Sequence, residues 1–191
     1  MKKLNDLILA DDSSADDKIT SGLLNNHIHF LYGEIEAENT NKAIQWIVYE
    51  NLANSDKLLT LYINSEGGNL DGAFGLIDIM RNSKQPIRTI GVGSICSAAF
   101  LIFAAGTKGE RYVAKNTSIM CHQYASEMNG KFHDMKAFVR ESDLANLRMS
   151  RHLQECTGMD ARNVKTKLLP PSDVWFSAEE IVELGVADHI F

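Results

Sequence analysis

The chain has 191 residues, of which 45% are hydrophobic and 23% charged, and its formal net charge is -6. This length and composition are typical of one soluble globular domain whose core is large enough to be stable without disulfide bonds. The negative balance, with no run of Lys or Arg, argues against a surface that binds nucleic acid.

Cysteine use and the apolar segments indicate where the protein works. Cys96, Cys121 and Cys156 are an odd number without paired spacing, and no C-x-x-C pattern suggests a zinc site. We therefore expect a reducing compartment, the cytoplasm, and no bound metal. The N-terminal segment MKKLNDLILADDSSADD is too acidic for a signal peptide, and no run of about 18 apolar residues predicts a membrane span.

The chain opens with an acidic segment. Residues 1–18 are polar and acidic from Asp11 onward, and their aspartates repel one another in any compact arrangement. We interpret residues 1–18 as a flexible N-terminal arm and residues 19–191 as the folded domain.

Apolar patterns beyond the arm alternate between strand and helix. Strands are expected at 27–35, 58–65, 86–93, 111–114, 117–123 and 186–191. Helices are expected at 40–54, 69–82, 98–106 and 132–156, and a last one opens with the capping box of Ser177 and Glu180. A turn of small residues is expected at 94–97. Strands that alternate with helices in this way predict an α/β fold with largely parallel strands.

Gly67 and Gly68 lie between a predicted buried strand and a predicted helix. Paired glycines permit unusual dihedral angles, and amides near a helix N-terminus can bind a developing negative charge. Taken alone, such a pair is more often a tight turn.

Ser97 stands at the start of the apolar helix predicted at 98–106, where the helix dipole favours an anion and a serine nucleophile would gain from its position. Taken alone, a serine at such a position is more often a helix cap. Cys96, directly before it, is a second conceivable nucleophile, but neighbouring side chains at a helix start point in different directions.

His122 and Asp173 supply the two other groups that a serine nucleophile needs. His122 ends a short apolar run, and its imidazole has the pKa range of a general base. Asp173 precedes Trp175 and Phe176, beside which a partly desolvated carboxylate requires a partner. Taken alone, a core histidine and a surface acid are the commoner explanations. Together with Ser97, the two residues complete the Ser-His-Asp set of acyl transfer.

Five ordered segments resemble the ClpP family of caseinolytic serine peptidases. They are Y-I-N-S-E-G-G at 62–68, S-A-A-F-L-I-F-A-A-G at 97–106, T-K-G-E-R-Y at 107–112, N-T-S-I-M-C-H-Q at 116–123 and D-V-W-F-S-A at 173–178. The similarity extends over about residues 19–191. It implies a crotonase-like spiral of β-β-α units from which a handle, at about 123–157, protrudes.

The resemblance also implies residue roles and partners. Ser97 would be the nucleophile, His122 the base and Asp173 the group that orients it, with the amides of Gly68 and Ala98 as the oxyanion hole. The implied activity is a serine endopeptidase that cleaves unfolded polypeptides through an acyl-enzyme. Two stacked heptameric rings of this chain, or of this chain with paralogues, would enclose the sites, and an AAA+ ATPase would deliver substrate. This chain would need no cofactor, because the ATPase uses the ATP.

The sequence departs from the family pattern at several positions. Glu66 replaces the proline beside the glycines, Ala98 replaces the methionine after the nucleophile, and Ser172 replaces the arginine before the aspartate. The handle strand expected at 124–130 is poorer in glycine than usual, and the ATPase-docking surface has Thr60 where an aromatic is common. This divergence favours an accessory or phage-encoded member of the family.

Two other functions stay open at this level. A non-catalytic ring subunit would assemble with active paralogues, although an intact triad argues against that role. A crotonase-like enzyme would act on an acyl-CoA thioester in place of a peptide. A metal held by His27 and His29 has weak support, because two ligands without a third rarely make a site.

Overall fold

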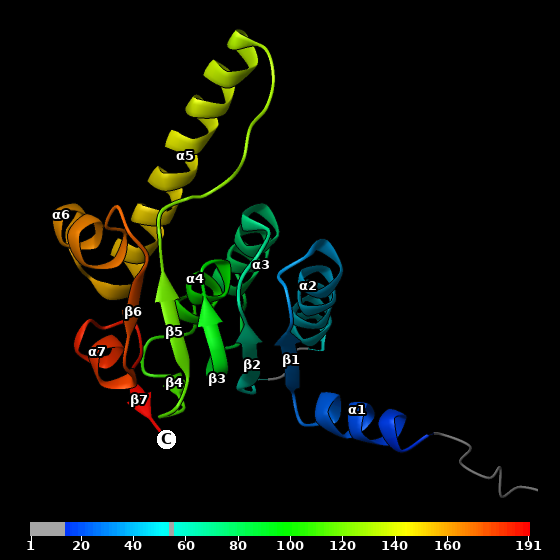
Figure 1. Ribbon diagram of the computed structural model, residues 1–191. Helices are drawn as coiled ribbons and strands as arrows, with labels where there is room; N and C mark the ends of the chain where they lie inside the picture. The colour runs from blue at the N-terminus through cyan, green and yellow to red at the C-terminus, as the bar shows by residue number, and fades with distance from the viewer. Residues whose placement is uncertain (1–13, 54–55) are drawn as a thin grey trace, which may run out of the picture.

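The computed structural model describes residues 14–53 and 56–191, which form a sheet flanked by helices (Figure 1). The strands are β1 (Ile28–Tyr32), β2 (Leu59–Ser65), β3 (Ile87–Cys96), β4 (Arg111–Val113), β5 (Ser118–Cys121), β6 (Val174–Phe176) and β7 (His189–Ile190). The helices are α1 (Ala15–Asn25), α2 (Ala37–Leu52), α3 (Leu70–Arg81), α4 (Ala98–Ala104), α5 (Phe132–Thr157), α6 (Ala161–Asn163), the π-helix η1 (Val164–Leu168) and α7 (Ala178–Glu183). Within the described ranges, no helix has the length and apolar character needed to cross a membrane.

The sheet is largely parallel, as the alternation of elements predicts. Its main path runs β1-β2-β3-β4-β7 with every pair parallel, and β5 also pairs parallel with β3. β6 runs antiparallel along β5. The predicted α/β fold is confirmed.

β3 is longer than the sequence predicts. Residues 94–96, expected in a turn, continue the strand because Gly93, at φ +65°, redirects the chain. The first half of β3 then pairs with β4 and the second half with β5. Any other residue would be strained at this φ, and its Cβ would displace the Asn64 side chain, whose Oδ1 would lie 2.5 Å away. The redirected end of β3 brings Ser97 beside β5.

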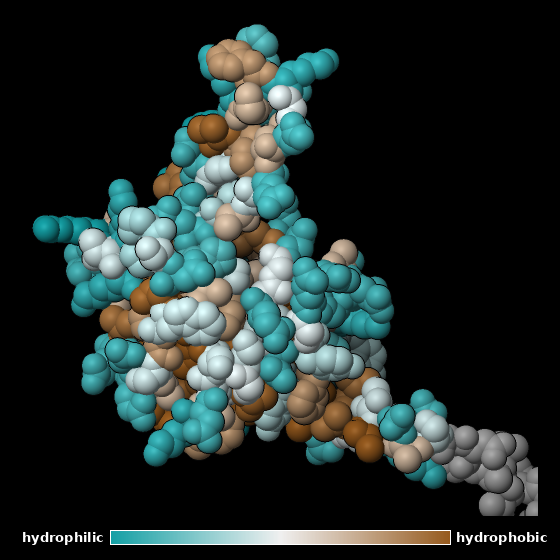
Figure 2. Space-filling view, viewed as in Figure 1, coloured by the Kyte–Doolittle hydropathy of each residue, from teal (hydrophilic) through white to brown (hydrophobic). Residues whose placement is uncertain are grey.

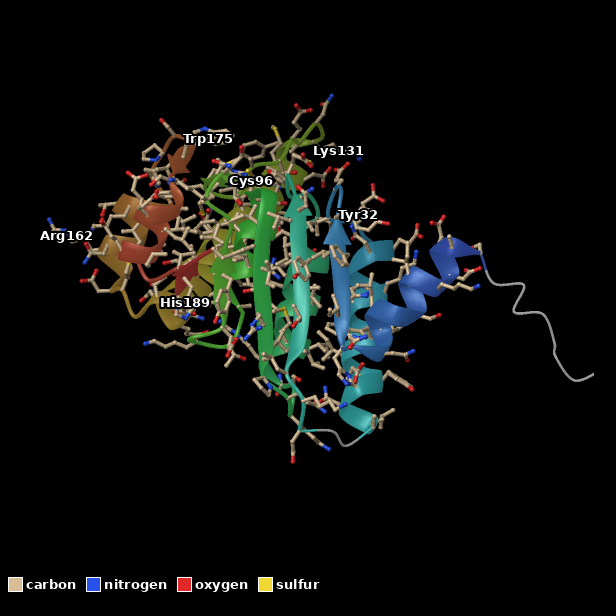
Figure 3. The ribbon with its side chains drawn as sticks, turned by 90° about the horizontal axis from the view of Figure 1, so that it is seen from below. Tyr32, Cys96, Lys131, Arg162, Trp175 and His189 are labelled. Atoms are coloured by element: carbon tan, nitrogen blue, oxygen red, sulfur yellow. The ribbon has the colours of Figure 1, made fainter. Side chains whose placement is uncertain are left out.

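α4 lies at the centre of the core. Each of its 7 residues is buried, and complete burial of a large apolar side chain contributes about 1.5–3 kcal/mol. α3 lies between α2 and α4 on one face of the sheet (Figures 1 and 3). The helix that follows Ser97 is therefore held rigidly by packing on all sides.

α5 projects away from the sheet as an arm (Figure 1). Its 26 residues correspond to a length of about 39 Å. The buried residues of α5 all lie in its C-terminal half, whereas Phe132, Met135 and Val139 in the projecting half are exposed (Figure 2). The projecting half therefore leaves an apolar stripe uncovered in the single chain.

The segment that leads from β5 to the tip of α5 differs from the expectation. The resemblance implies a strand at 124–130, but these residues form no strand in the structure. The segment runs beside the projecting helix (Figure 1), and its Tyr124 amide donates to Oδ1 of Asn146 on α5 at 2.9 Å rather than to a neighbouring strand.

The N-terminal arm predicted at 1–18 lies partly outside the described residues, which begin at 14. Its last residues form the first turn of α1. Ser14 and Asp17 make a reciprocal capping box, and Asp16 and Asp17 lie where the helix dipole favours negative charge. The repulsion expected between these acids is thus offset by their place at a helix N-terminus.

Candidate active site

Ser97 joins β3 to α4 in a backbone conformation that is rare for any residue but glycine. Its φ is +55° and its ψ is -123°. The peptide is fixed on both sides, because the Ser97 amide donates to the Met120 carbonyl at 2.9 Å and the Ser97 carbonyl accepts from the Phe100 amide at 3.1 Å. Strained serines on a sharp strand-to-helix turn are typical of nucleophiles.

The side chain of Ser97 makes no capping hydrogen bond to α4, so the structure does not support the common interpretation of this serine as a helix cap. Its Oγ instead lies 2.7 Å from Nε2 of His122, which directly follows β5. In the neutral tautomer that carries its proton on Nδ1, the hydroxyl donates and Nε2 accepts. This is the contact through which a histidine removes a proton from a serine.

Asp173 lies close to this pair but does not join it. Cys121 faces Val174 in the antiparallel ladder of β5 and β6, and continuing that register places Asp173 opposite His122. The Asp173 side chain is exposed, and among the described residues no hydrogen bond or ion pair connects it to His122. The expected desolvation beside Trp175 is wrong, because Trp175 is 63% exposed on the edge strand β6.

Two free amides, one from the turn after β2 and one from the start of α4, lie near Ser97. The Gly68 amide has no acceptor among the hydrogen bonds of the described residues, and Ala98 is the first residue of α4, whose amide has no acceptor within the helix. Both residues line the same cavity as Ser97 and His122. Two amides placed in this way can hold an oxyanion.

Gly67 has a role that the sequence reasoning missed. A Cβ on Gly67 would lie 2.6 Å from the Cβ of Ser97 and 2.7 Å from the carbonyl oxygen of Cys96. The Gly67 amide donates to the buried Oγ of Ser65 at 3.0 Å, which fixes the turn. The Gly-Gly pair is the sequence feature that indicates this role, since Gly67 permits the close approach to the serine and Gly68 presents its amide.

The cavity beside Ser97 has a volume of about 240 Å³. It lies at the edge of the sheet where the parallel strands end. Figure 3 shows this edge at Cys96 and Tyr32, which are the last residues of β3 and β1. Sites in parallel α/β sheets commonly occupy that edge. The lining residues are Gly68, Asn69, Leu70, Asp71, Ser97, Ala98, His122, Gln123, Tyr124, Ala125, Ser126, Glu141 and Met149.

Other sequence candidates lie elsewhere. Cys96 does not line the cavity, and its thiol lies 3.3 Å from Oγ of Ser94. Burial raises the pKa of the Cys121 thiol to about 12, so that this side chain acts as a core residue. His27 contacts Glu50 at 2.8 Å and His29 stacks on Trp46, and within the described part of the chain no three His, Cys, Asp or Glu side chains are grouped so as to hold a metal ion.

This mixed α/β fold brings together a strained serine, a histidine on its hydroxyl and two free amides, which are the groups that serine acyl-transfer chemistry requires. The comparisons with known proteins then give the family. The family model described as Clp protease matches residues 11–191. The chain is 30% identical over 175 residues to the ATP-dependent Clp protease proteolytic subunit 2 of Treponema denticola, a match that covers 92% of this chain and 86% of that relative.

The chain belongs to the Clp protease family. The resemblance inferred from the five sequence segments is confirmed, and the largely parallel sheet with its helices is consistent with the fold of that family.

Proposed function

We propose that the chain is a serine endopeptidase, the proteolytic subunit of an ATP-dependent Clp protease, which cleaves unfolded polypeptides to short peptides. The observation that carries the proposal is the 2.7 Å contact between Ser97 Oγ and His122 Nε2. It lies in one cavity with the free amides of Gly68 and Ala98. Family membership supports the same function.

Acylation follows from this arrangement. Ser97 Oγ attacks the carbonyl carbon of the scissile peptide bond while His122 Nε2 takes the hydroxyl proton. The carbonyl oxygen becomes an oxyanion, which accepts hydrogen bonds from the amides of Gly68 and Ala98. Removal of one such donor typically slows catalysis by about 10²–10³-fold. His122 then gives its proton to the leaving amine, and the acyl group stays on Ser97.

Deacylation repeats the steps with water in place of serine. His122 takes a proton from the water, the hydroxide attacks the ester carbonyl, and Ser97 regains its proton as the second product leaves. No step requires a cofactor in this chain.

We assign to Asp173 the orientation of His122. Side chains opposite each other in an antiparallel ladder have Cβ atoms about 4.5–5.5 Å apart. Rotation of the Asp173 side chain can therefore bring its carboxylate to Nδ1 of His122 while the backbone stays in place. Substrate or ring assembly that excludes water from the exposed carboxylate would favour this contact, because an acid removed from water needs a partner.

The projecting half of α5 supports a ringed assembly. Its apolar stripe, with segment 124–130 beside it that forms no strand, is a surface that a second copy of the chain can cover. We propose two stacked rings of seven subunits, served by an AAA+ ATPase that supplies unfolded chains. Ser172, in place of arginine, cannot make the ion pair between rings that the family uses there.

The test is turnover by the purified chain and by its Ser97→Ala variant. Cleavage of an unfolded polypeptide or fluorogenic peptide, absent in the variant, is the expected result, and native mass should show a multiple of seven chains. Turnover of an acyl-CoA thioester without peptide cleavage would replace the proposal with crotonase-like chemistry. Cleavage only in the presence of active paralogues, unchanged by Ser97→Ala, would make the chain a non-catalytic ring subunit.

A further inference from the structure

The cavity beside Ser97 has an acidic mouth. Of the described residues that line it, Asp71 and Glu141 carry a formal charge, and both are negative. Asp71 lies in the first turn of α3, three residues after Gly68, whereas Glu141 lies across the cavity on α5. Two carboxylates from separate elements therefore converge on one small volume.

Arg148 neutralises only part of this charge. Its Nη2 lies 3.2 Å from Oδ1 of Asp71 and 4.0 Å from Oε1 of Glu141, while its guanidinium lies over the ring of Phe74. Arg148 itself does not line the cavity. The single positive charge of Arg148 offsets only one of the two negative charges, so the cavity keeps a net negative charge.

The more buried residues that line the cavity are apolar. Met149 is 4% exposed, Ala98 is buried and Leu70 is half-buried, whereas the side chains of Asp71 and Glu141 are more exposed. An apolar wall below an acidic mouth matches a side chain with a long apolar stem and a cationic end, such as Lys or Arg. An uncharged aliphatic side chain would add no positive charge, and the two carboxylates would share the single cation of Arg148.

The substrate residue that enters this cavity follows from the geometry of the serine. The amides of Gly68 and Ala98 hold the oxygen of the carbonyl that Ser97 attacks. The P1 side chain is carried by the Cα bonded to that carbonyl, on the N-terminal side of the cleaved bond, and is therefore the nearest to the cavity. We propose that Asp71 and Glu141 select a basic P1 side chain. This specificity rests on the peptidase function proposed above.

The test compares fluorogenic peptides that differ only at P1, with lysine against norleucine, which has the same unbranched stem without the charge. At low ionic strength, kcat/KM for the lysine peptide should exceed that for the norleucine peptide by about tenfold. The ratio should fall toward one at high salt, because salt screens exposed charges.

Asp71→Asn and Glu141→Gln should each lower this ratio severalfold while the norleucine peptide is still cleaved, which shows that each variant is folded. Asp78→Asn is the matched control. Asp78 is exposed on the same face of α3, two turns or about 10 Å away, and its replacement should leave the ratio unchanged.

A norleucine peptide cleaved as fast as the lysine peptide would overturn the proposed specificity, as would an unchanged ratio in both cavity variants. Cleavage of the norleucine peptide that depends on Ser97 would leave the peptidase function intact in either case. Failure of the enzyme to cleave any peptide of the series, together with the absence of a covalent adduct on Ser97 after fluorophosphonate treatment, would refute both the proposed specificity and the peptidase function.

Discussion

Replacement of Gly67 by alanine tests whether the turn after β2 sets the geometry of the nucleophile. The new Cβ would lie 2.6 Å from the Cβ of Ser97, 2.7 Å from the Cys96 carbonyl oxygen and 3.0 Å from the Ala98 amide. All three atoms belong to the strained turn, so relief of the clash must displace the serine or the helix start. Both would move Oγ away from His122.

The magnitude has two parts. Gly67 has φ +102°, and alanine at a left-handed position costs about 1–2 kcal/mol. Overpacking against backbone adds about 1–3 kcal/mol. Gly67→Ala should therefore lower the free energy of unfolding by about 2–5 kcal/mol and slow peptide cleavage by about 10²-fold or more, since misplacement by 1 Å costs that much.

Gly109→Ala is the matched control, because Gly109 has φ +90° and a Cβ added there would meet no atom within 4 Å. It should show the dihedral cost alone, about 1–2 kcal/mol, with peptidase activity retained. Chemical denaturation at one fixed chain concentration and steady-state kinetics measure the two quantities. Equal losses of stability in the two variants, with activity intact in Gly67→Ala, would refute the argument.

Three more predictions concern buried charge and strain. Burial lowers the pKa of His152 from 6.5 to about 4, with a smaller contribution from the charge of Arg81 and against the opposing effect of the Leu101 carbonyl. The free energy of unfolding should therefore fall by up to about 3 kcal/mol as pH falls from 6.5 to 4. His152→Gln should flatten this pH dependence, and an unchanged pH dependence in the variant would exclude His152 as its source. Burial raises the pKa of Asp188, but hydrogen bonds and the charge of Arg111 outweigh this effect and hold the pKa below 3.8. Ionised Asp188 therefore stabilises the folded state above pH 3.8, and this stabilisation is lost as pH falls further. Asp188→Asn should cost about 3–5 kcal/mol at neutral pH, because Arg111 is left buried without its counter-ion; a loss below about 1 kcal/mol in thermal or chemical unfolding would contradict this. Ser97→Gly should be more stable than Ser97→Ala by about 1–2 kcal/mol, since only glycine relieves the positive φ, and equal unfolding midpoints would show that the turn is unstrained.

Local sequence patterns predict most of the elements because their causes are local. The apolar run at 58–65 becomes β2, and the periodic pattern at 132–156 becomes α5 within a residue at each end. The capping box of Ser177 and Glu180 forms as expected, with the Glu180 amide donating to Ser177 Oγ at 3.2 Å. The arrangement at 94–96 could not be predicted in this way, because it depends on pairing with β5, which lies more than twenty residues later.

The candidate site, too, can be predicted from the sequence only in part. The motifs identify Ser97, His122 and Gly68, and the fold brings these three to one cavity. Neither the positive φ of Ser97 nor its close approach to Gly67 can be recognised in the sequence, because both arise from tertiary packing. The Asp173 role stays a prediction, since the carboxylate is exposed in the single chain and its contact with His122 depends on a side-chain rotation.

The central claim is that Ser97 is a nucleophile activated by His122. Treatment with a fluorophosphonate, followed by peptide mapping in a mass spectrometer, tests it most directly. The reagent should add to Ser97 in the wild-type chain, much more slowly in His122→Ala, and not at all at this position in Ser97→Ala. The absence of any adduct on Ser97 in every assembly state, with the chain folded, would contradict the account.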